Sequence, residues 1–249
     1  MEYILNFSKC CLSFNGRNLD RIIDGYSTIN VEGRQMFSPS LSYQKVRGRD
    51  GDIMIEDSYP SREITVHYLI KAENNHWFLK NMKLLTMYLQ SKEDVEFSFA
   101  DEQGVRFGRL SSFDDPPFDS NVGIGKFTIH CSDPYLYSKI RKDTNQVRDL
   151  VYDYYPVKPE SIEMTLTISA NKLVLKNISR GLRIVLNTNF KAGDKVTFKD
   201  RKIYKNKENI LSMLDYVESD YFDFDIYARD KITCNLANNV IINFRERVL

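Results

Sequence analysis

The sequence contains few of the residues on which catalytic and metal-binding sites are most often built. It has only four cysteines, three histidines and one tryptophan in 249 residues. The cysteines are Cys10, Cys11, Cys131 and Cys234, and the histidines are His67, His76 and His130. No C-x-x-C pair or other metal-ligand spacing occurs, so four reduced thiols are expected instead of a zinc site or a disulfide framework. No nucleophile with a matching base can be assembled either, and we predict no enzymatic activity, no metal and no cofactor.

An excess of either charge is also lacking. Lys and Arg number 35 against 34 for Asp and Glu, which leaves a formal charge of +1. Proteins that bind nucleic acid through phosphate neutralisation need a larger basic surplus, so nucleic-acid readout is not expected. No apolar run approaches about 18 residues, which argues against a membrane span. The N-terminus lacks the basic start of a secretion signal, and a soluble chain made in a cytosol is expected.

Apolar residues alternate with polar ones along most of the chain. Alternation with a period of two gives a strand one apolar face. The clearest such segments are 64–70, 95–99, 127–131, 164–168, 182–186 and 240–244. Fifteen Tyr and fifteen Phe also favour pleated surfaces. The sequence therefore predicts a mainly β protein.

One segment has a helical period instead. Between residues 75 and 92, Phe78, Met82, Leu85 and Leu89 follow one another at spacings of four, three and four. Neither Gly nor Pro interrupts the segment, which predicts one amphipathic helix whose apolar stripe lies on a sheet.

A turn signal between two extended flanks indicates a β-hairpin. The sequence Gly48-Arg49-Asp50-Gly51-Asp52 contains Asp-Gly, a pair suited to tight hairpin turns. Its flanks, 41–47 and 53–57, carry few apolar residues, and an isolated hairpin of this kind is at best marginally stable. We expect it to lie on another surface, either its own domain or a neighbouring subunit.

Two domains are expected. The first covers residues 1–138, and a charged stretch followed by Tyr154-Tyr155-Pro156-Val157-Lys158-Pro159 suggests a linker over 139–160. Residues 161–249 contain at least six short strand patterns separated by turns such as 192–194. This spacing is typical of a β-sandwich.

Two further motifs have plain structural explanations. Gly123-Ile124-Gly125-Lys126 superficially resembles a phosphate loop, but it lacks the required glycine spacing and the Ser or Thr after Lys, so we interpret it as a loop that leads into a strand. The acidic residues between 215 and 225 alternate with aromatic ones, and we expect a solvated strand face there rather than a calcium site.

The order of these features resembles the distal tail protein family of long-tailed phages that infect Gram-positive bacteria. The segments of the first half that carry the resemblance are Phe14-Asn15-Gly16, Val31-Glu32-Gly33-Arg34, Gly48-Arg49-Asp50-Gly51, Arg62-Glu63-Ile64-Thr65-Val66 and Phe127-Thr128-Ile129-His130-Cys131-Ser132-Asp133-Pro134-Tyr135-Leu136-Tyr137. Those of the second half are Leu175-Lys176-Asn177, Gly193-Asp194-Lys195-Val196 and Val240-Ile241-Ile242-Asn243-Phe244-Arg245. Each segment is unspecific by itself, and their shared order over nearly the whole chain carries the resemblance.

The resemblance implies a structural protein of the virion tail tip, made in the cytoplasm of the bacterial host. It implies an N-terminal β-sandwich or barrel-like domain with the helix and a hairpin "belt", which forms a homohexameric ring around the tail channel. It also implies a galectin-like or carbohydrate-binding-module-like second domain. The implied partners are the tail tube protein, the tail-tip fibre or lysin protein and, in some phages, receptor-binding proteins, while DNA passes through the channel unread.

The hairpin is the candidate subunit interface. Its candidate contact residues are Tyr43, Val46, Arg47, Arg49, Ile53 and Ile55. A carbohydrate-binding or host-adhesion module is the alternative, and it would require an aromatic platform beside polar groups. The only tryptophan, Trp77, lies in the other half of the chain.

Overall fold

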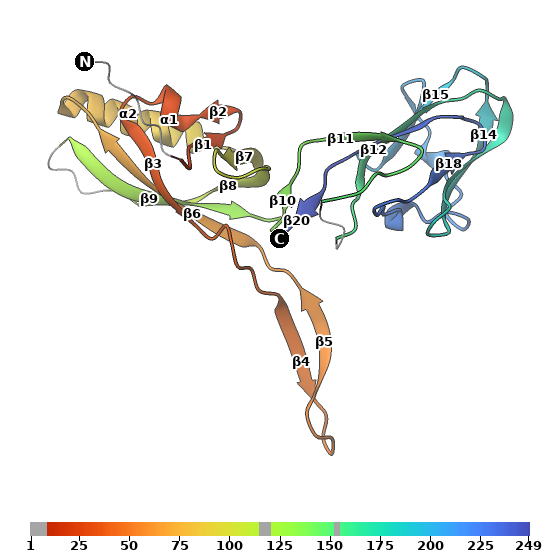
Figure 1. Ribbon diagram of the computed structural model, residues 1–249, viewed down its shortest axis with the longest axis horizontal. Helices are drawn as coiled ribbons and strands as arrows, with labels where there is room; N and C mark the ends of the chain where they lie inside the picture. Colours follow the sequence, from red (N-terminus) through yellow and green to blue (C-terminus); the bar gives the residue numbers. More distant parts are fainter. Residues whose placement is uncertain (1–8, 115–120, 152–154) are drawn as a thin grey trace. The chain divides into compact units, whose positions relative to one another are not determined.

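The computed structural model describes residues 9–114, 121–151 and 155–249. The chain forms two compact units, the first running to Leu136 and the second from Tyr137 to Val248 (Figure 1). Both units consist mainly of antiparallel β-strands, which confirms the predicted fold class. No helix among the described residues is long and apolar enough to cross a membrane.

The first unit is built on one seven-stranded sheet with the strand order β2-β1-β7-β8-β9-β6-β3. Its strands are β1 (Leu12–Phe14), β2 (Arg17–Asn18), β3 (Tyr26–Glu32), β6 (Arg62–Lys71), β7 (Val95–Phe99), β8 (Arg106–Phe113) and β9 (Val122–Cys131). The longest ladder joins β6 to β9 from Arg62–Cys131 at one end to Lys71–Val122 at the other. Alternate residues of these strands, among them Ile64, Val66 and Ile129, are fully buried on the inner face.

The predicted amphipathic helix is α2 (Asn75–Leu89). The Asn74 side chain begins it by accepting a hydrogen bond from the Trp77 amide at 3.1 Å. Phe78, Leu85 and Leu89 are buried in the same core as the sheet residues. Residues 90–92 do not continue the helix, because Gln90 already has extended backbone angles.

A buried carboxylate joins two strands that lie at opposite ends of the sheet order. Asp20, in the one-turn helix α1 (Leu19–Ile22), accepts hydrogen bonds from the Leu12 amide on β1 and from the amide and hydroxyl of Thr28 on β3. The three distances are 3.0, 2.7 and 2.9 Å. Asp20 therefore draws the sheet toward a barrel-like curvature. Neither α1 nor this role of Asp20 is indicated by the hydrophobic pattern.

The second unit is a β-sandwich whose two sheets share one hydrophobic core. The larger sheet contains β11 (Arg141–Thr144), β12 (Pro159–Thr165), β15 (Lys195–Lys199), β16 (Lys202–Lys205), β17 (Glu208–Asn209) and β19 (Val240–Phe244), in the order β11-β19-β12-β15-β16-β17. The smaller contains β13 (Ala170–Asn177), β14 (Leu182–Phe190) and β18 (Ile232–Cys234), in the order β14-β13-β18. The remaining elements are the strands β10 (Leu136–Tyr137) and β20 (Arg247–Val248), which pair with each other, and the 3-10 turns η1 (Leu211–Met213) and η2 (Tyr221–Asp223).

Residues 139–160 differ from the expected linker. Strand β11 pairs with β19 along its whole length, and Val147 and Val157 are buried in the core of the sandwich. The strand is hard to recognise in the sequence, because an edge strand buries only part of its surface and therefore carries many polar side chains.

Three local expectations were wrong. Strand β12 ends at Thr165, so Leu166 is still buried but Ile168 is exposed. The segment 220–225 forms η2 and not a strand face. Residues 123–126 lie within β9 and not in a loop before it.

All four cysteines are free thiols, as expected from their spacing. Cys10, Cys11 and Cys131 are buried and Cys234 is half-buried. Desolvation raises the pKa of the Cys131 thiol to about 12, which leaves it protonated and unreactive at neutral pH.

Candidate subunit interface

A hairpin projects from the first unit between β3 and β6 (Figure 1). Its strands, β4 (Ser40–Lys45) and β5 (Asp52–Ser58), pair only with each other. Every residue of both strands is exposed. The expected hairpin is therefore present, and its own domain does not cover it.

The hairpin turns through the loop 46–51, and not through a two-residue Asp-Gly turn. Gly48 and Gly51 have φ angles of 82° and 78°, while Asp50 keeps a negative φ. A two-residue type I′ turn needs positive φ at both central residues, so Asp50-Gly51 does not form one. The Arg49 amide instead donates to the Val46 carbonyl oxygen at 3.2 Å.

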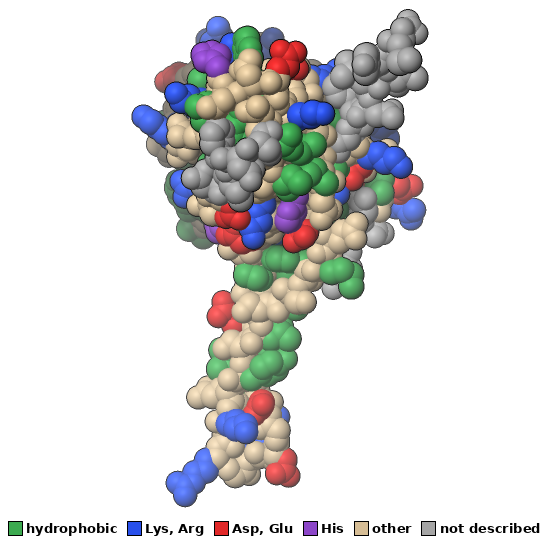
Figure 2. Space-filling view, turned by 90° about the vertical axis from the view of Figure 1, so that its left-hand side faces the viewer, with side chains coloured by type: hydrophobic (Ala, Val, Ile, Leu, Met, Phe, Trp, Pro, Cys, Tyr) green, Lys and Arg blue, Asp and Glu red, His purple; other side chains and the backbone are tan. Residues whose placement is uncertain are grey.

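Apolar side chains cover both faces of the hairpin. The register places Tyr43 opposite Met54 on one face and Gln44 opposite Ile53 on the other. Ile55 occupies a bulge between the Tyr43–Met54 pair and the Ser42–Glu56 pair. Ile55 is 60% exposed. The structure places all six candidate contact residues on exposed parts of the hairpin, and it adds Leu41 and Met54. Figure 2 shows hydrophobic side chains along the stem and charged ones toward the free end.

The root of the hairpin is held by a buried arginine. Arg62, the first residue of β6, donates from Nε to the Pro134 carbonyl at 3.0 Å and from Nη1 to the carbonyls of Gly33 and Arg34 at 3.0 and 2.9 Å. Its guanidinium also lies 4.2 Å from the ring centre of Phe37. Arg62 thus joins the two chain segments that lead into and out of the hairpin to the end of the domain.

A second layer of ion pairs supports the same root. Arg34 binds the Asp101 carboxylate through both terminal nitrogens, at 2.6 and 2.9 Å. The Arg34 guanidinium holds the pKa of Asp101 below its ordinary value, mainly through these hydrogen bonds. Arg106 pairs with Glu102 and donates to the Arg34 carbonyl at 3.3 Å. The sequence analysis missed these arginines because an arginine at a strand terminus is ordinarily read as solvated.

The charges of the hairpin are not neutralised by the rest of the described chain. Asp52, Glu56 and Asp57 lie on β5, and no ion pair joins any of them to another described residue. A row of exposed apolar residues on a ribbon that its own domain does not cover is a feature of protein–protein contact surfaces.

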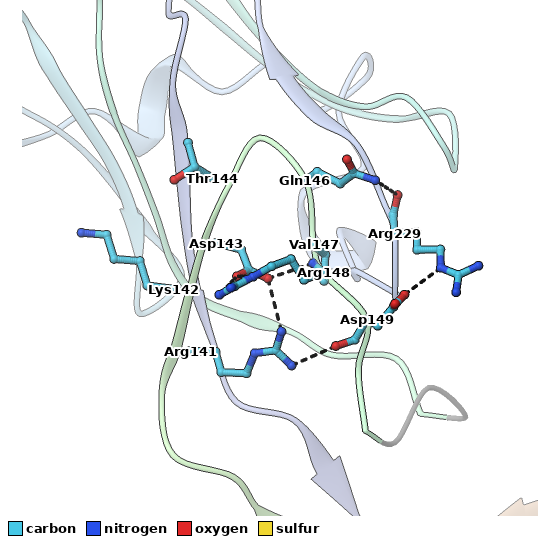
Figure 3. Close-up of a pocket in the computed structure, with 9 residues that line it drawn as sticks. All are labelled: Arg141, Lys142, Asp143, Thr144, Gln146, Val147, Arg148, Asp149 and Arg229. Carbon is cyan, nitrogen blue, oxygen red and sulfur yellow. Dashed lines mark hydrogen bonds and ion pairs between the residues drawn. The ribbon is translucent and has the colours of Figure 1, made fainter.

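The second unit has a depression lined mainly by charged and polar residues (Figure 3). At its base the buried Asp143 accepts hydrogen bonds from the Arg148 amide at 2.9 Å and from Arg148 Nε at 2.7 Å. Arg141 pairs with the buried Glu246, and Arg229 lies 2.7 Å from Asp149. Since these arginines are matched by carboxylates, the depression is an ion-pair network that organises the segment after β11.

A smaller cavity of about 430 Å³ in the second unit has an aromatic wall. Tyr221 and Phe222 of η2 form part of it, and their rings meet edge to face at 5.4 Å. Phe222 is 63% exposed. Lys158, Asp200 and Arg201 supply polar groups at the rim. The aromatic and acidic residues of this segment alternate as in a strand, so their pattern does not indicate an aromatic platform.

Two of the three histidines lie beside carboxylates. His67 lies 3.2 Å from Glu32, and His130 lies 2.5 Å from Glu63, both on the solvent face of the sheet. Within the described ranges, no cluster of three or more His, Cys, Asp or Glu side chains has the geometry of a metal site.

Two family models match this chain. The phage tail protein RIFT-related domain matches residues 22–130, and the C-terminal domain of siphovirus-type tail components matches residues 154–247. Among curated proteins, the distal tail protein of Bacillus phage SPP1 is 25% identical over 130 residues. That match spans 51% of this chain and about half, 49%, of the SPP1 protein.

Solved structures extend the similarity to nearly the full chain. The Dit protein of phage SPP1, a hub adsorption-apparatus protein of Gram-positive-infecting phages, aligns with a TM-score of 0.81 at 17% identity and covers 96% of this chain and 99% of that one. A chain of the phage p2 baseplate in its activated conformation aligns with a TM-score of 0.54 at 10% identity and covers 93% of each chain. At such identities these alignments show a common fold.

Proposed function

Because the chain belongs to the distal tail protein family of siphophages, we propose that its hairpin acts as the belt that joins six copies into a ring around the tail channel. The protein is a structural component of the virion tail tip. The ring, its six-fold order and the role of the hairpin are the proposed part. Tyr43, Val46, Arg47, Arg49, Ile53 and Ile55 are the proposed contact residues.

The full exposure of the hairpin is the observation that carries the proposal. An isolated two-stranded ribbon gains little stability from its own contacts. Covering about 400–600 Å² of its apolar surface on a neighbour would contribute on the order of 10 kcal/mol before the costs of association. Those costs are large, so one contact is expected to be modest. Ring closure strengthens the assembly because the last subunit makes two contacts while it loses its freedom once.

The partners of the ring follow from its position. We propose that one side binds the tail tube protein and the other the tail-tip fibre or lysin protein, with receptor-binding proteins attached in some phages. The role is structural and not enzymatic, and no cofactor is involved. DNA would cross the channel without base readout, consistent with a formal charge of only +1.

Replacement of residues 44–54 by a short Gly-Ser loop tests the belt. We expect the variant to keep the circular dichroism spectrum of a β protein and to sediment as a monomer under conditions where the parent forms the ring. The reason is that the substitution removes most of the apolar stem but leaves the Arg62 root in place. A truncated protein that still sediments as the ring would show that another surface closes it.

Matched point variants sharpen this test. Ile55→Ser removes an exposed apolar side chain from the stem, while Val217→Ser removes an even more exposed one, at 97%, from the second unit. The first variant should weaken assembly at least ten-fold and the second should leave it unchanged. Equal effects would indicate nonspecific association through exposed apolar residues.

Carbohydrate binding by the second unit is a second candidate function, favoured by the aromatic cavity beside η2. A stacked sugar would use the exposed ring of Phe222, with Asp200 and Arg201 as hydrogen-bonding groups. Titration of the protein with a panel of mono- and disaccharides, followed by NMR, should shift resonances around η2, and Phe222→Ala should abolish those shifts. Unshifted spectra at millimolar sugar would remove this candidate.

A further inference from the structure

Strand β9 reverses its polarity pattern at one end. Along most of the strand the apolar residues, such as Phe127 and Ile129, point into the core. At its N-terminal end, glycines occupy the inner positions and the apolar Val122 and Ile124 face solvent. Ile124 is 64% exposed. A strand shaped only by its own core would place these residues the other way round.

The presence of glycine at the inner position 125 has a steric cause. A Cβ atom on Gly125 would lie 2.5 Å from the hydroxyl of the buried Tyr68, so the inner face has no room for a side chain there. That packing explains the glycine but not the apolar residues on the outer face. Those residues gain nothing from the core of their own domain.

Neighbouring strands extend the exposed residues into a patch. The register places Leu69 of β6 directly beside Ile124 of β9. On the other side of β6, Ile29 lies at the bulge of β3 between the Thr28–Tyr68 and Asn30–His67 pairs. Leu69 is half-buried and Ile29 is 50% exposed. We call the residues Ile29, Leu69, Val122 and Ile124 the outer-face patch.

We infer that the outer-face patch is the docking site for the hairpin stem of a second copy of this chain. This inference rests on the proposed function and specifies its acceptor surface. The patch and the hairpin lie at opposite ends of β6: the hairpin leads into Arg62, whereas Leu69 and Lys71 lie about 20–30 Å further along at roughly 3.3 Å per residue. Two different surfaces on one chain give a head-to-tail contact, which is the type that closes into rings.

Charge supports this pairing. Lys71 at the edge of the patch is exposed and forms no ion pair with a described residue, and Lys126 beyond it makes only a long 3.7 Å contact with Asp114. The β5 strand of the hairpin carries Asp52 and Glu56 beside its isoleucines. In the proposed contact, carboxylates of the hairpin would lie against lysines at the edge of the patch.

The outer side of α2 is a less suitable acceptor. Its aromatic residues are already covered by cations of the same chain: the Lys80 ammonium lies 4.1 Å from the Trp77 ring centre, and the Arg17 guanidinium lies 5.0 Å from that of Tyr88. The outer-face patch is aliphatic, and no cation of the described residues is placed over it.

Disulfide trapping between copies tests the assignment. In a Cys234→Ser background, where the remaining native thiols are buried, the variants Ile55→Cys and Ile124→Cys are combined in one chain and oxidised with copper–phenanthroline. We expect a ladder of covalent oligomers on a non-reducing gel. The matched control combines Ile55→Cys with Met87→Cys on α2, whose side chain is 54% exposed, and should give at least ten-fold less cross-linked product. No ladder, or equal ladders from both pairs, would overturn the assignment.

Charge variants separate this inference from the ring itself. Ile124→Asp should abolish the ring in sedimentation experiments without changing the circular dichroism spectrum, and Ile55→Lys in the same chain should restore part of it. A parent that forms rings and an Ile124→Asp variant that also forms them would refute the patch alone. A parent that remains monomeric and uncross-linked at every concentration would refute both the patch and the proposed self-assembly.

Discussion

At the scale of single residues, buried charged groups set the geometry of the first unit. Arg62 is 1% exposed and has three backbone carbonyls and an aromatic ring as partners, with no carboxylate against it. A buried arginine of this kind is retained for the groups it positions, because its desolvation offsets much of its contact energy. Asp20 does the same for the curvature of the sheet. Neither role is readable from the sequence, because hydrophobic pattern predicts charged residues only as exposed.

The Arg34–Asp101 pair predicts a pH dependence at the root of the hairpin. Since the pKa of Asp101 is lowered in the folded state, its contribution is present at neutral pH and is lost as the pH falls below about 4 through the lowered folded value. The pair is partly exposed, so we expect Asp101→Asn to lower the free energy of unfolding at pH 7 by roughly 0.5–1 kcal/mol. At pH 2.5 the difference between variant and parent should shrink toward zero.

Fluorescence of Trp77 gives the readout, because it is the single tryptophan and belongs to the first unit. Urea titrations at the two pH values compare the parent with Asp101→Asn. An equal difference in the free energy of unfolding between parent and variant at both pH values would mean that the aspartate acts through packing or neutral hydrogen bonds and not through its charge.

At the scale of elements, the sequence predicts best where burial alone decides the pattern. The alternation of 64–70 and the four-three-four spacing of α2 both follow from one face meeting a core, and both are present. Hydrophobic pattern does not predict the structure correctly where factors other than core burial decide it. Strand β11 buries too little to show alternation, the segment 221–223 forms a short 3-10 turn, and Gly125 occupies an inner position of β9 because the buried Tyr68 leaves no room for a side chain there.

The position of the hairpin could be predicted from the sequence, but the contacts that hold its root could not. The turn residues and weak flanks of 41–57 indicate a hairpin in need of a partner surface, and the structure places that hairpin in solvent. Its root depends on contacts that join residues far apart in the chain, such as Arg62 with Pro134. One sequence without its fold carries no local signal of such a contact.

The root predicts that Arg62 fixes the direction of the hairpin. Arg62→Met would leave the carbonyls of Gly33, Arg34 and Pro134 without their donor, at a cost on the order of 2–3 kcal/mol. We expect the sheet to remain folded while the hairpin samples several directions. Spin labels at Arg49→Cys and Lys92→Cys, in the Cys234→Ser background, should give one narrow distance distribution in dilute parent protein and a broad one in the variant. Identical narrow distributions would show that Arg62 serves stability alone.

At the scale of the whole molecule, the protein joins two β units of which one carries the features of self-assembly. The first unit has an exposed hairpin with a fixed root and, at the other end of the same strands, an aliphatic patch without a core function. The SPP1 distal tail protein, to which the chain is similar, is described as part of a hub adsorption apparatus, and a comparable role is proposed for these features. In the second unit, the buried carboxylate of Asp143 is matched by Arg141 and Arg148 of the same unit.

Electron microscopy of the purified full chain tests the assembly most directly. Negatively stained particles, prepared over a concentration series and classified without imposed symmetry, should show rings with a central channel and six-fold order, as single rings or stacked ones. The parallel sample with residues 44–54 replaced by Gly-Ser should show only isolated subunits. Rings of another order, or rings that persist without the hairpin, would contradict the proposal that this hairpin closes a homohexamer.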